Sequence, residues 1–345
     1  MNADVLIQYN PASISIILNR PQAIHSLTIP MIETIKKALQ DAMQKEWLQF
    51  VIFYANGGKG FCAGGDIKAL YTASVAGDSN YIKEFYAKEY DMDYMIHTYP
   101  KPVIAITDGI TMGGGLGLVA GADYVIVSEN TVMAMPESRI GFFPDVGSTG
   151  WLFTKCKPGY PKYLALTGDE LHGGECVAVG LAHYQVLSHT YMQLIQELEQ
   201  IKEISDIHKT IEGIITRYAL PISAESSDRD RWVADYFDTD VPLQRILESL
   251  TQCSFEHELC NGVFSRIAQR SPTSLVLTDI LLAANKGRPL EEVFAREHKA
   301  AMFMTMHHDY REGVRARIID KDNKPCWQPE RIEDVNADTL RRVVY

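Results

Sequence analysis

The segment "FVIFYANGGKGFCAGGDI", residues 50–67, holds the features that decide the fold of this 345-residue chain. A continuous apolar run, residues 50–55, leads directly into a glycine-containing turn, residues 57–67. Such a run is typical of a strand buried on both faces, and strands of that kind pair in parallel through helical crossovers. The segment therefore predicts a strand, a tight turn and a helix.

The same pattern recurs through the first half of the chain. Residues 13–18 alternate and are β-branched, and residues 102–107 and 124–128 are further apolar runs. A second glycine turn, residues 108–118, comes after the run that ends at residue 107. No GxGxxG comes after the first strand, so we expect a repeated β/α core rather than a doubly wound dinucleotide-binding fold.

Helical periodicity completes these units and takes over near residue 190. After a possible Thr28 cap, one helical face would carry the apolar side chains Ile32, Ile35, Leu39 and Met43. Beyond residue 190 the pattern is almost entirely helical, and Ser271-Pro272 with Gly287 marks the start and end of one helix. We therefore expect an α/β core over residues 1–190 and a helical C-terminal region over residues 191–345.

Composition limits the functions that are open. Hydrophobic residues make up 46% and charged residues 22%, as in soluble globular domains, and the net charge is −11 without a basic block. The acidity argues against a nucleic-acid partner, and the absence of a run of 18 apolar residues argues against a membrane partner. The start of the chain lacks a signal-peptide pattern, so we expect a cytoplasmic protein. We expect the scattered cysteines to be reduced thiols rather than disulfides or metal ligands. The six are Cys62, Cys156, Cys176, Cys253, Cys260 and Cys326.

Chemistry is suggested by the two glycine turns together with "AMPESRIGFFPDVGSTGW", residues 134–151. Each turn can be a simple strand-to-helix connection, but two such turns can also aim N–H groups at one oxygen, as an oxyanion hole does. Residues 134–151 place Glu137 and Asp145 directly after prolines in an otherwise mostly apolar stretch. Alternatives for the two acids are a solvated loop position for Glu137 and a helix N-cap for Asp145.

These motifs, "FCAGGDI", "GITMGGGLGL" and "AMPE…GFFPDVG", resemble the enoyl-CoA hydratase/isomerase (crotonase) superfamily. Within it, Asp145 and the tail "SPTSLVLTDIL…HDYREGVRARIIDKDNKPCWQP" are similar to the 3-hydroxyisobutyryl-CoA hydrolases. The resemblance covers nearly the whole chain. It implies the crotonase (ClpP-like) spiral of ββα units with a helical C-terminal region, and an acyl-CoA thioester as substrate.

The resemblance also implies roles for particular residues. The backbone N–H groups of Gly65 and Gly114 would form the oxyanion hole. Hydratases hold water between two glutamates, but the first of those positions is Gly117 here, while Glu137 matches the second. Glu137 would attack the thioester carbonyl or activate water, and Asp145 would hold the 3-hydroxyl of the substrate.

The same resemblance implies further contacts with substrate. Glu89 matches a glutamate that contacts substrate in the hydrolases, although an exposed helix acid paired with Lys88 or Lys83 is an alternative. Because coenzyme A carries phosphates, basic side chains should lie near it, and three flank the matching segments: Arg20, Lys59 and Lys68. His25 and Ser26 depart from the usual "NA" of the family, and Ser148 interrupts its "DVGG".

We therefore predict an acyl-CoA thioester hydrolase, acting on 3-hydroxyisobutyryl-CoA in valine breakdown, with no metal and no cofactor beyond the coenzyme A of the substrate. Two alternatives stay open: an enoyl-CoA hydratase or isomerase, and a non-catalytic acyl-CoA-binding or scaffold protein. A homo-oligomer is possible, since members of the superfamily often form trimers. The choice between 3-hydroxyisobutyryl and 3-hydroxypropionyl, which differ by one methyl, is too fine for the sequence to make.

Overall fold

The computed structural model describes residues 3–202, 205–222, 227–253 and 257–345. These residues form two compact units. The first comprises residues 1–65, 91–133 and 170–224, and the second comprises residues 66–90, 134–169 and 225–345. This division differs from the expected boundary at residue 190, because segments from both halves of the chain enter each unit.

The first unit contains two sheets. The larger has the order β1 (Val5–Tyr9), β2 (Ser13–Leu18), β3 (Phe50–Ala55), β5 (Val103–Thr107), β7 (Tyr124–Val127) and β10 (Tyr184–Gln185). Its strands pair in parallel except for β1, which forms an antiparallel pair with β2. The parallel sheet predicted from the apolar runs is confirmed, whereas the short β1 strand was not anticipated.

The smaller sheet is built from short strands that come directly after strands of the larger one. Its order is β4 (Gly60–Cys62), β6 (Ile110–Met112), β8 (Val132–Ala134) and β9 (Leu171–His172). Strands β3, β5 and β7 of the larger sheet lead into β4, β6 and β8, respectively. Helices α2 (Ile67–Ala76) and α4 (Gly114–Ala120) come next in the first two cases, which gives the predicted strand–strand–helix repeat.

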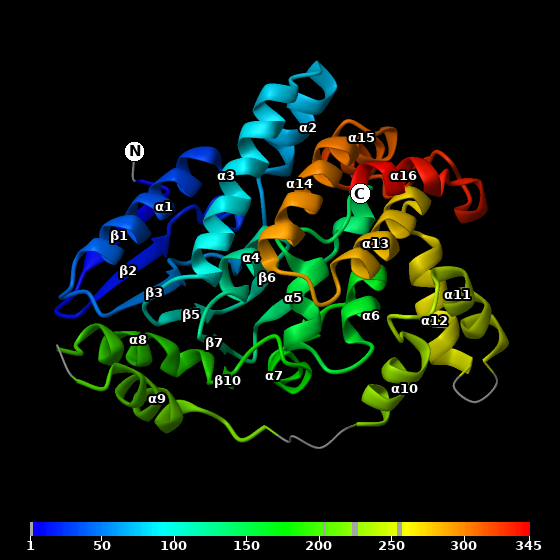
Figure 1. Cartoon of the computed structure of the whole chain (residues 1–345). Coiled ribbons are helices and arrows are strands. Elements are labelled where there is room, and N and C mark those ends of the chain that lie inside the picture. The colour runs from blue at the N-terminus through cyan, green and yellow to red at the C-terminus, as the bar shows by residue number, and fades with distance from the viewer. Residues whose placement is uncertain (1–2, 203–204, 223–226, 254–256) are drawn as a thin grey trace. The chain divides into compact units, whose positions relative to one another are not determined.

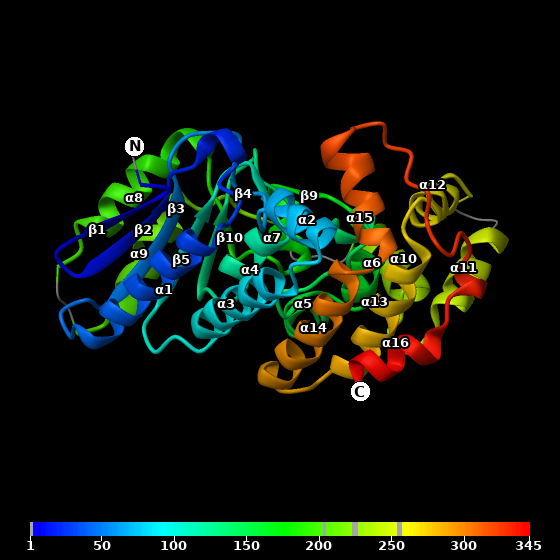
Figure 2. The ribbon, with the colours of Figure 1, turned by 90° about the horizontal axis from the view of Figure 1, so that it is seen from above.

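Helices cover the larger sheet on both faces. In Figures 1 and 2, α1 (Ile29–Gln44) lies on one side, and α8 (Tyr191–Glu199) and α9 (Ile207–Tyr218) lie on the other. The side chains of Ile195 and Ile215 pack with Ile52 and Ile104 in one apolar cluster. The unit also contains η1 (Pro21–Ala23), α7 (Gly174–Val179) and η3 (Ser188–Thr190).

The second unit is helical. Before residue 170 it holds α2, the first part of α3 (Ser79–His97), η2 (Glu137–Ile140), α5 (Ser148–Lys155) and α6 (Tyr160–Thr167). Its later helices are α10 (Asp228–Tyr236), α11 (Leu243–Gln252), α12 (His257–Ala268), α13 (Pro272–Asn285), α14 (Leu290–Thr305), α15 (His308–Val314), the π-helix η4 (Arg315–Ile319), η5 (Ile332–Asp334) and α16 (Ala337–Val344). None of the described helices is both long and apolar enough to cross a membrane.

Local helix signals in the sequence are largely confirmed. The Thr28 side chain accepts a hydrogen bond from the Met31 N–H, and Ser271 caps α13 at the Ser274 N–H. Gly287 adopts a φ of 70° directly beyond the end of α13. Met43 is the exception on the predicted apolar face, because it is 41% exposed.

The cysteine prediction is wrong for one pair. Cys253 and Cys260 form a disulfide with a Cα–Cα separation of 6.4 Å, while the other four cysteines remain thiols. Cys253 lies directly beyond the end of α11, and Cys260 lies in α12. Two successive helices bring the sulfurs together, which the seven-residue spacing does not reveal.

Candidate active site

Three acids from separate segments are buried in the second unit. Glu137 begins η2, Asp145 lies in the loop before α5, and Glu89 belongs to α3. Their exposed fractions are 8%, 5% and 2%, respectively. Because burial of a charge is costly without a partner, three buried acids in one region indicate a specific role. A solvated loop position for Glu137, the alternative considered from the sequence, is wrong.

Close packing fixes the position of η2. Gly141 ends this short helix with a φ of 71°, and a Cβ atom placed there would lie 2.0 Å from the backbone oxygen of Asp309. A Cβ on Gly313 would likewise lie 2.4 Å from the carbonyl carbon of Ile140. Only glycines allow this approach of α15 to η2, so the backbone that carries Glu137 has little freedom to move.

A strained turn presents Asp145. The next residue, Val146, has a φ of 52°, which is rare for a β-branched side chain. The indole N–H of Trp151 donates a hydrogen bond to the carbonyl of Val146 at 2.9 Å and helps to hold this conformation. The hydroxyl of Tyr90 donates to Oδ2 of Asp145 at 2.7 Å. Such strain, maintained by surrounding contacts, is characteristic of functional sites.

Asp145 does not cap the helix that comes after it. Gly147 is the N-cap of α5 and has no side chain to serve this role. Glu297 of α14 takes it instead, because its carboxylate accepts from the N–H of Gly147 at 2.6 Å and from the N–H and hydroxyl of Thr149 at 3.1 and 2.5 Å. The N-cap alternative for Asp145 is therefore wrong, and its carboxylate is left available for another function.

The position of Glu89 also excludes its simpler alternative. The carboxyl group is buried and its Oε1 has no hydrogen-bond partner among the described residues. Lys88 pairs with Glu84 at 2.6 Å, one turn earlier in α3. Glu89 is therefore not the exposed, lysine-paired acid that ordinary helix patterning would produce.

Burial shifts the titration of all three acids, and the charge of Asp145 adds to the shift at the other two. Burial, followed by the charge of Asp145, raises the pKa of Glu89 and of Glu137 well above the ordinary value. The positive charge of Arg139 opposes this shift at Glu137. Burial raises the pKa of Asp145 to about 7, although the hydrogen bond from Tyr90 lowers it. Asp145 is therefore placed to exchange a proton near neutral pH, and such raised pKa values are common among groups used in acid–base or nucleophilic chemistry.

The two glycine turns lie side by side in the first unit. Gly64 has a φ of 100°, and a Cβ there would lie 3.2 Å from the backbone nitrogen of Gly114. Gly114 is the first residue of α4, and Gly65 directly precedes Asp66, whose side chain caps α2. The turns that the sequence singled out are thus neighbours.

The three basic residues occupy different surroundings. Arg20 donates from Nη1 to the carbonyl and the hydroxyl of Ser26 at 2.9 and 3.0 Å, so it holds the loop in which the family pattern is altered. Buried His25 contributes by accepting from the Arg20 N–H at 2.9 Å. Lys59, in the first unit, and Lys68, in the second, are exposed. A role in binding coenzyme A stays a prediction for all three.

Sequence reasoning missed several groups around the acids. Tyr90 was not singled out, although it adjoins Glu89 in the sequence. The hydroxyl of buried Tyr310 has no hydrogen-bond partner among the described residues, and burial followed by the charge of Asp145 raises its pKa. Glu297 is fully buried 150 positions from the Gly147 N–H that it accepts from. No local pattern marks Tyr310 or Glu297.

Comparisons with known proteins place the chain in a family. Residues 13–344 match the family described as enoyl-CoA hydratase/isomerase, and the chain belongs to this family. It is 33% identical to the mitochondrial 3-hydroxyisobutyryl-CoA hydrolase of Gallus gallus, over 97% of this chain and 86% of the relative. The resemblance stated from the motifs is confirmed, and with it the prediction of an acyl-CoA thioester hydrolase.

Two further similarities bear on the fold and on the alternatives. The carnitinyl-CoA dehydratase of Mycobacterium thermoresistibile has a similar structure, with a TM-score of 0.90 and 28% identity over 100% of this chain and 97% of that one. The crotonase fold is therefore confirmed. The small ribosomal subunit protein mS47 of Arabidopsis thaliana is 32% identical over 97% of this chain and 83% of its own length.

The expected cytoplasmic location is contradicted. Curated relatives from several vertebrates are named as mitochondrial hydrolases. The expectation rested on the absence of a signal-peptide pattern, which concerns secretion alone and does not separate the cytoplasm from an organelle.

Proposed function

We propose that this protein hydrolyses a short 3-hydroxyacyl-CoA thioester, with 3-hydroxyisobutyryl-CoA of valine breakdown as the substrate. One observation carries the proposal: Asp145 is buried and interacts with Glu137, yet it is not used as a helix cap. Gly117 lies in α4, at the position where a hydratase would have its other glutamate, and it has no carboxyl side chain. Asp145 would contact the substrate hydroxyl and Glu137 would act at the thioester carbonyl. This pair of roles suits hydrolysis of a hydroxyacyl thioester.

In the proposed reaction, the Glu137 carboxylate attacks the thioester carbonyl. By the family resemblance, the N–H groups of Gly65 and Gly114 stabilise the negative charge that develops on the carbonyl oxygen. The carbon–sulfur bond breaks, coenzyme A leaves as a thiol after taking a proton, and an anhydride links the acyl group to Glu137. Water then opens the anhydride and releases the 3-hydroxy acid. General-base activation of water by Glu137 would give the same products.

Asp145 would accept a hydrogen bond from the 3-hydroxyl of the substrate. The hydrogen bond from Tyr90 to Oδ2 favours the ionised carboxylate and fixes its orientation. Glu89, whose Oε1 has no partner among the described residues, would contact the same substrate. The proposed chemistry uses carboxylates, backbone N–H groups and water, and it requires no redox cofactor or metal.

The first test mixes purified protein with 3-hydroxyisobutyryl-CoA and, separately, with crotonyl-CoA. Thiol release from the hydroxyacyl substrate that disappears in Glu137→Gln supports the proposal. Glu84→Gln is the matched control, because it removes an exposed acid of α3 and should keep full activity. Loss of the enoyl chromophore without thiol release would instead identify a hydratase.

The role of Asp145 needs a substrate comparison. The expected result is that Asp145→Asn loses more kcat/KM for 3-hydroxyisobutyryl-CoA than for isobutyryl-CoA, which lacks the hydroxyl. The difference should be about tenfold or more, because a hydrogen bond to a charged group contributes about 1.5–3 kcal/mol. Equal losses on both substrates would remove the proposed contact.

A non-catalytic role is the second candidate, and the similarity to the ribosomal protein mS47 favours it. A protein of that kind could keep the fold while using its surface for assembly. Absence of thiol release and of enoyl loss with both substrates, from a folded protein, would bring this candidate to the front.

A further inference from the structure

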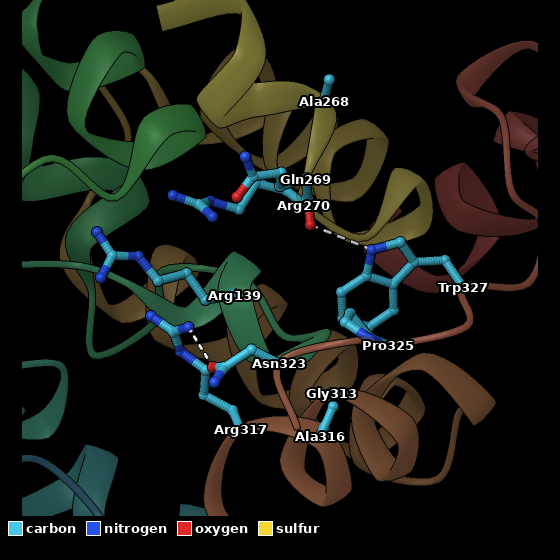
Figure 3. Close-up of a pocket in the computed structure, with 10 residues that line it drawn as sticks. All are labelled: Arg139, Ala268, Gln269, Arg270, Gly313, Ala316, Arg317, Asn323, Pro325 and Trp327. Atoms are coloured by element: carbon cyan, nitrogen blue, oxygen red, sulfur yellow. Dashed lines mark hydrogen bonds between the residues drawn. The ribbon is translucent and has the colours of Figure 1, made fainter. Parts of the chain in front are cut away.

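A cavity in the second unit lies beside η2 and is distinct from the acid cluster in its chemistry. Its volume is about 310 Å³, and it lies among the end of α12, the π-helix η4 and residues 323–327. Figure 3 shows three guanidinium groups gathered on one side of this cavity, those of Arg139, Arg270 and Arg317. Trp327 and Pro325 lie on the opposite side.

Arg270 is the most deeply placed of the three. It is 7% exposed, and its Nη2 donates to the carbonyl of Thr167, at the end of α6, at 2.9 Å. Its Nε has no hydrogen-bond partner among the described residues. Burial, followed by the positive charges of Arg139, Arg266 and Arg317, lowers the pKa of Arg270 to about 9. The structure thus holds a buried cation close to other cations.

The other two arginines also donate hydrogen bonds. Arg139 donates from Nη2 to the carbonyl of Gly168 at 2.8 Å, and Arg317 donates from Nη1 to Oδ1 of Asn323 at 2.6 Å. Within the described part of the chain, no carboxylate forms an ion pair with Arg270 or Arg317. Arg266, by contrast, pairs with Asp169 and does not line the cavity.

Buried Arg270 and the nearby charge of Arg317, without a carboxylate partner for either among the described residues, form an arrangement that an anion would stabilise. Guanidinium groups retain their charge at neutral pH and carry donors that match phosphate and carboxylate oxygens. The protein as a whole is acidic, with a net charge of −11, so the positive charge of three arginines around one cavity is opposite in sign to the net charge. Partial negative charge at the end of α6 offsets only part of the repulsion.

We propose that the cavity bounded by Arg139, Arg270 and Arg317 binds a small organic anion other than coenzyme A, whose phosphate or other dianionic group meets the arginines and whose flat apolar part meets Trp327. The cavity is too large for inorganic phosphate alone and falls at the lower end of the range for small-molecule sites, roughly 300–1,000 Å³. Trp327 is held in place, because its indole N–H donates to the carbonyl of Gln269 at 3.2 Å. The proposal does not depend on the hydrolase function.

Calorimetric titration with phenyl phosphate, inorganic phosphate and phenol tests the proposal, in a low-salt buffer free of other multivalent anions. Phenyl phosphate carries both required features, so it should bind more tightly than inorganic phosphate, and phenol should not bind. Absence of phenyl phosphate binding, or equal binding of phenol, would overturn the proposal.

Variants locate the binding. Arg317→Gln changes an exposed residue and should weaken phenyl phosphate binding about tenfold, as expected when a charge-assisted hydrogen bond to a dianion is lost. Arg245→Gln is the matched control: it removes the same charge from an exposed residue of α11 that does not line the cavity, and it should leave binding unchanged. Equal weakening in both variants would mean general charge attraction and would overturn the assignment.

Two further measurements complete the test. Arg270→Gln should weaken binding at least as much as Arg317→Gln, provided that its thermal unfolding shows a folded protein. Titration in saturating coenzyme A separates the two possible sources of a phosphate group. Unchanged phenyl phosphate binding supports a site for a separate metabolite, whereas complete competition would make the cavity part of the substrate site and overturn the proposal.

Discussion

The second unit contains two clusters of like charge, and they respond to burial in opposite ways. Glu89, Glu137 and Asp145 form the acid cluster, and Arg139, Arg270 and Arg317 form the arginine cluster. Burial raises the pKa values of all three acids, and the charge of Asp145 adds to the rise at Glu89 and Glu137, so these acids can become neutral by taking up protons. Arginine side chains retain their charge near neutral pH, so their cluster calls for a counter-anion. Similar crowding therefore indicates proton chemistry in one place and ligand binding in the other.

Glu137 and Arg139 connect the two clusters, since both belong to η2. The Arg139 charge lowers the pKa of Glu137 against the effect of burial. A short helix thus presents one residue to each cluster, and changes in η2 should affect both.

Replacement of Glu137 in the acid cluster should have the largest effect on activity. Glu137→Gln should reduce kcat for thioester hydrolysis by at least about 10²–10⁴-fold, the range for loss of a general base, and by more if Glu137 is the nucleophile. Thiol release under saturating substrate measures the effect. A folded variant with more than half of the original kcat would remove Glu137 from the mechanism.

Gly141→Ala should disturb both clusters by displacing η2. The added Cβ would lie 2.0 Å from a backbone oxygen, so unfolding free energy should fall by about 1–3 kcal/mol or more. Gly77→Ala is the control, because Gly77 has a similar φ of 72° but nothing within 4 Å of an added Cβ. Urea unfolding of both variants isolates the clash. Equal losses of unfolding free energy in the two variants would mean that the positive φ, and not the clash, causes the whole effect.

Asp145→Asn should change how stability depends on pH. The folded protein holds the pKa of Asp145 at about 7, above that of an unfolded aspartate, so the folded state binds more protons between about pH 4 and pH 7. This contribution to stability is present below pH 4 and is lost as the pH rises to 7. We therefore compare the unfolding free energy of Asp145→Asn with that of the wild type at each pH. This difference should favour the variant more at pH 8 than at pH 4, by more than about 1 kcal/mol.

Urea unfolding at the two pH values measures this difference. Asp235→Asn provides the control, since it removes an exposed carboxyl group of α10. A pH dependence in Asp145→Asn that equals that of the wild type would show that Asp145 does not titrate as proposed.

Arg139→Gln gives the smallest expected effect and sharpens the link between the clusters. Loss of the positive charge disfavours ionised Glu137, so the acid limb of the kcat/KM profile should move to higher pH. The direction matters more than the size. A shift to lower pH, or the same shift in Arg245→Gln, would contradict coupling through Arg139.

Local patterns explain which features the sequence could reveal. The runs that form β2, β3, β5 and β7, the glycine turns and the Ser271 cap depend on residues close in the chain, and all were readable. Family motifs then singled out Glu137 and Asp145. The sequence could not separate a helix cap from a site acid at Asp145, because the answer depended on distant Glu297.

The sequence by itself therefore determined the repeated strand–strand–helix architecture, the family and the two acids of the loop. Only the tertiary structure decided that Glu89 is buried with them, that Cys253 and Cys260 pair, and that three arginines from separate elements surround one cavity. The physical reason is the range of the interactions. Strand, turn and cap preferences act between near neighbours, whereas burial and charge crowding arise when long loops close and bring distant residues together.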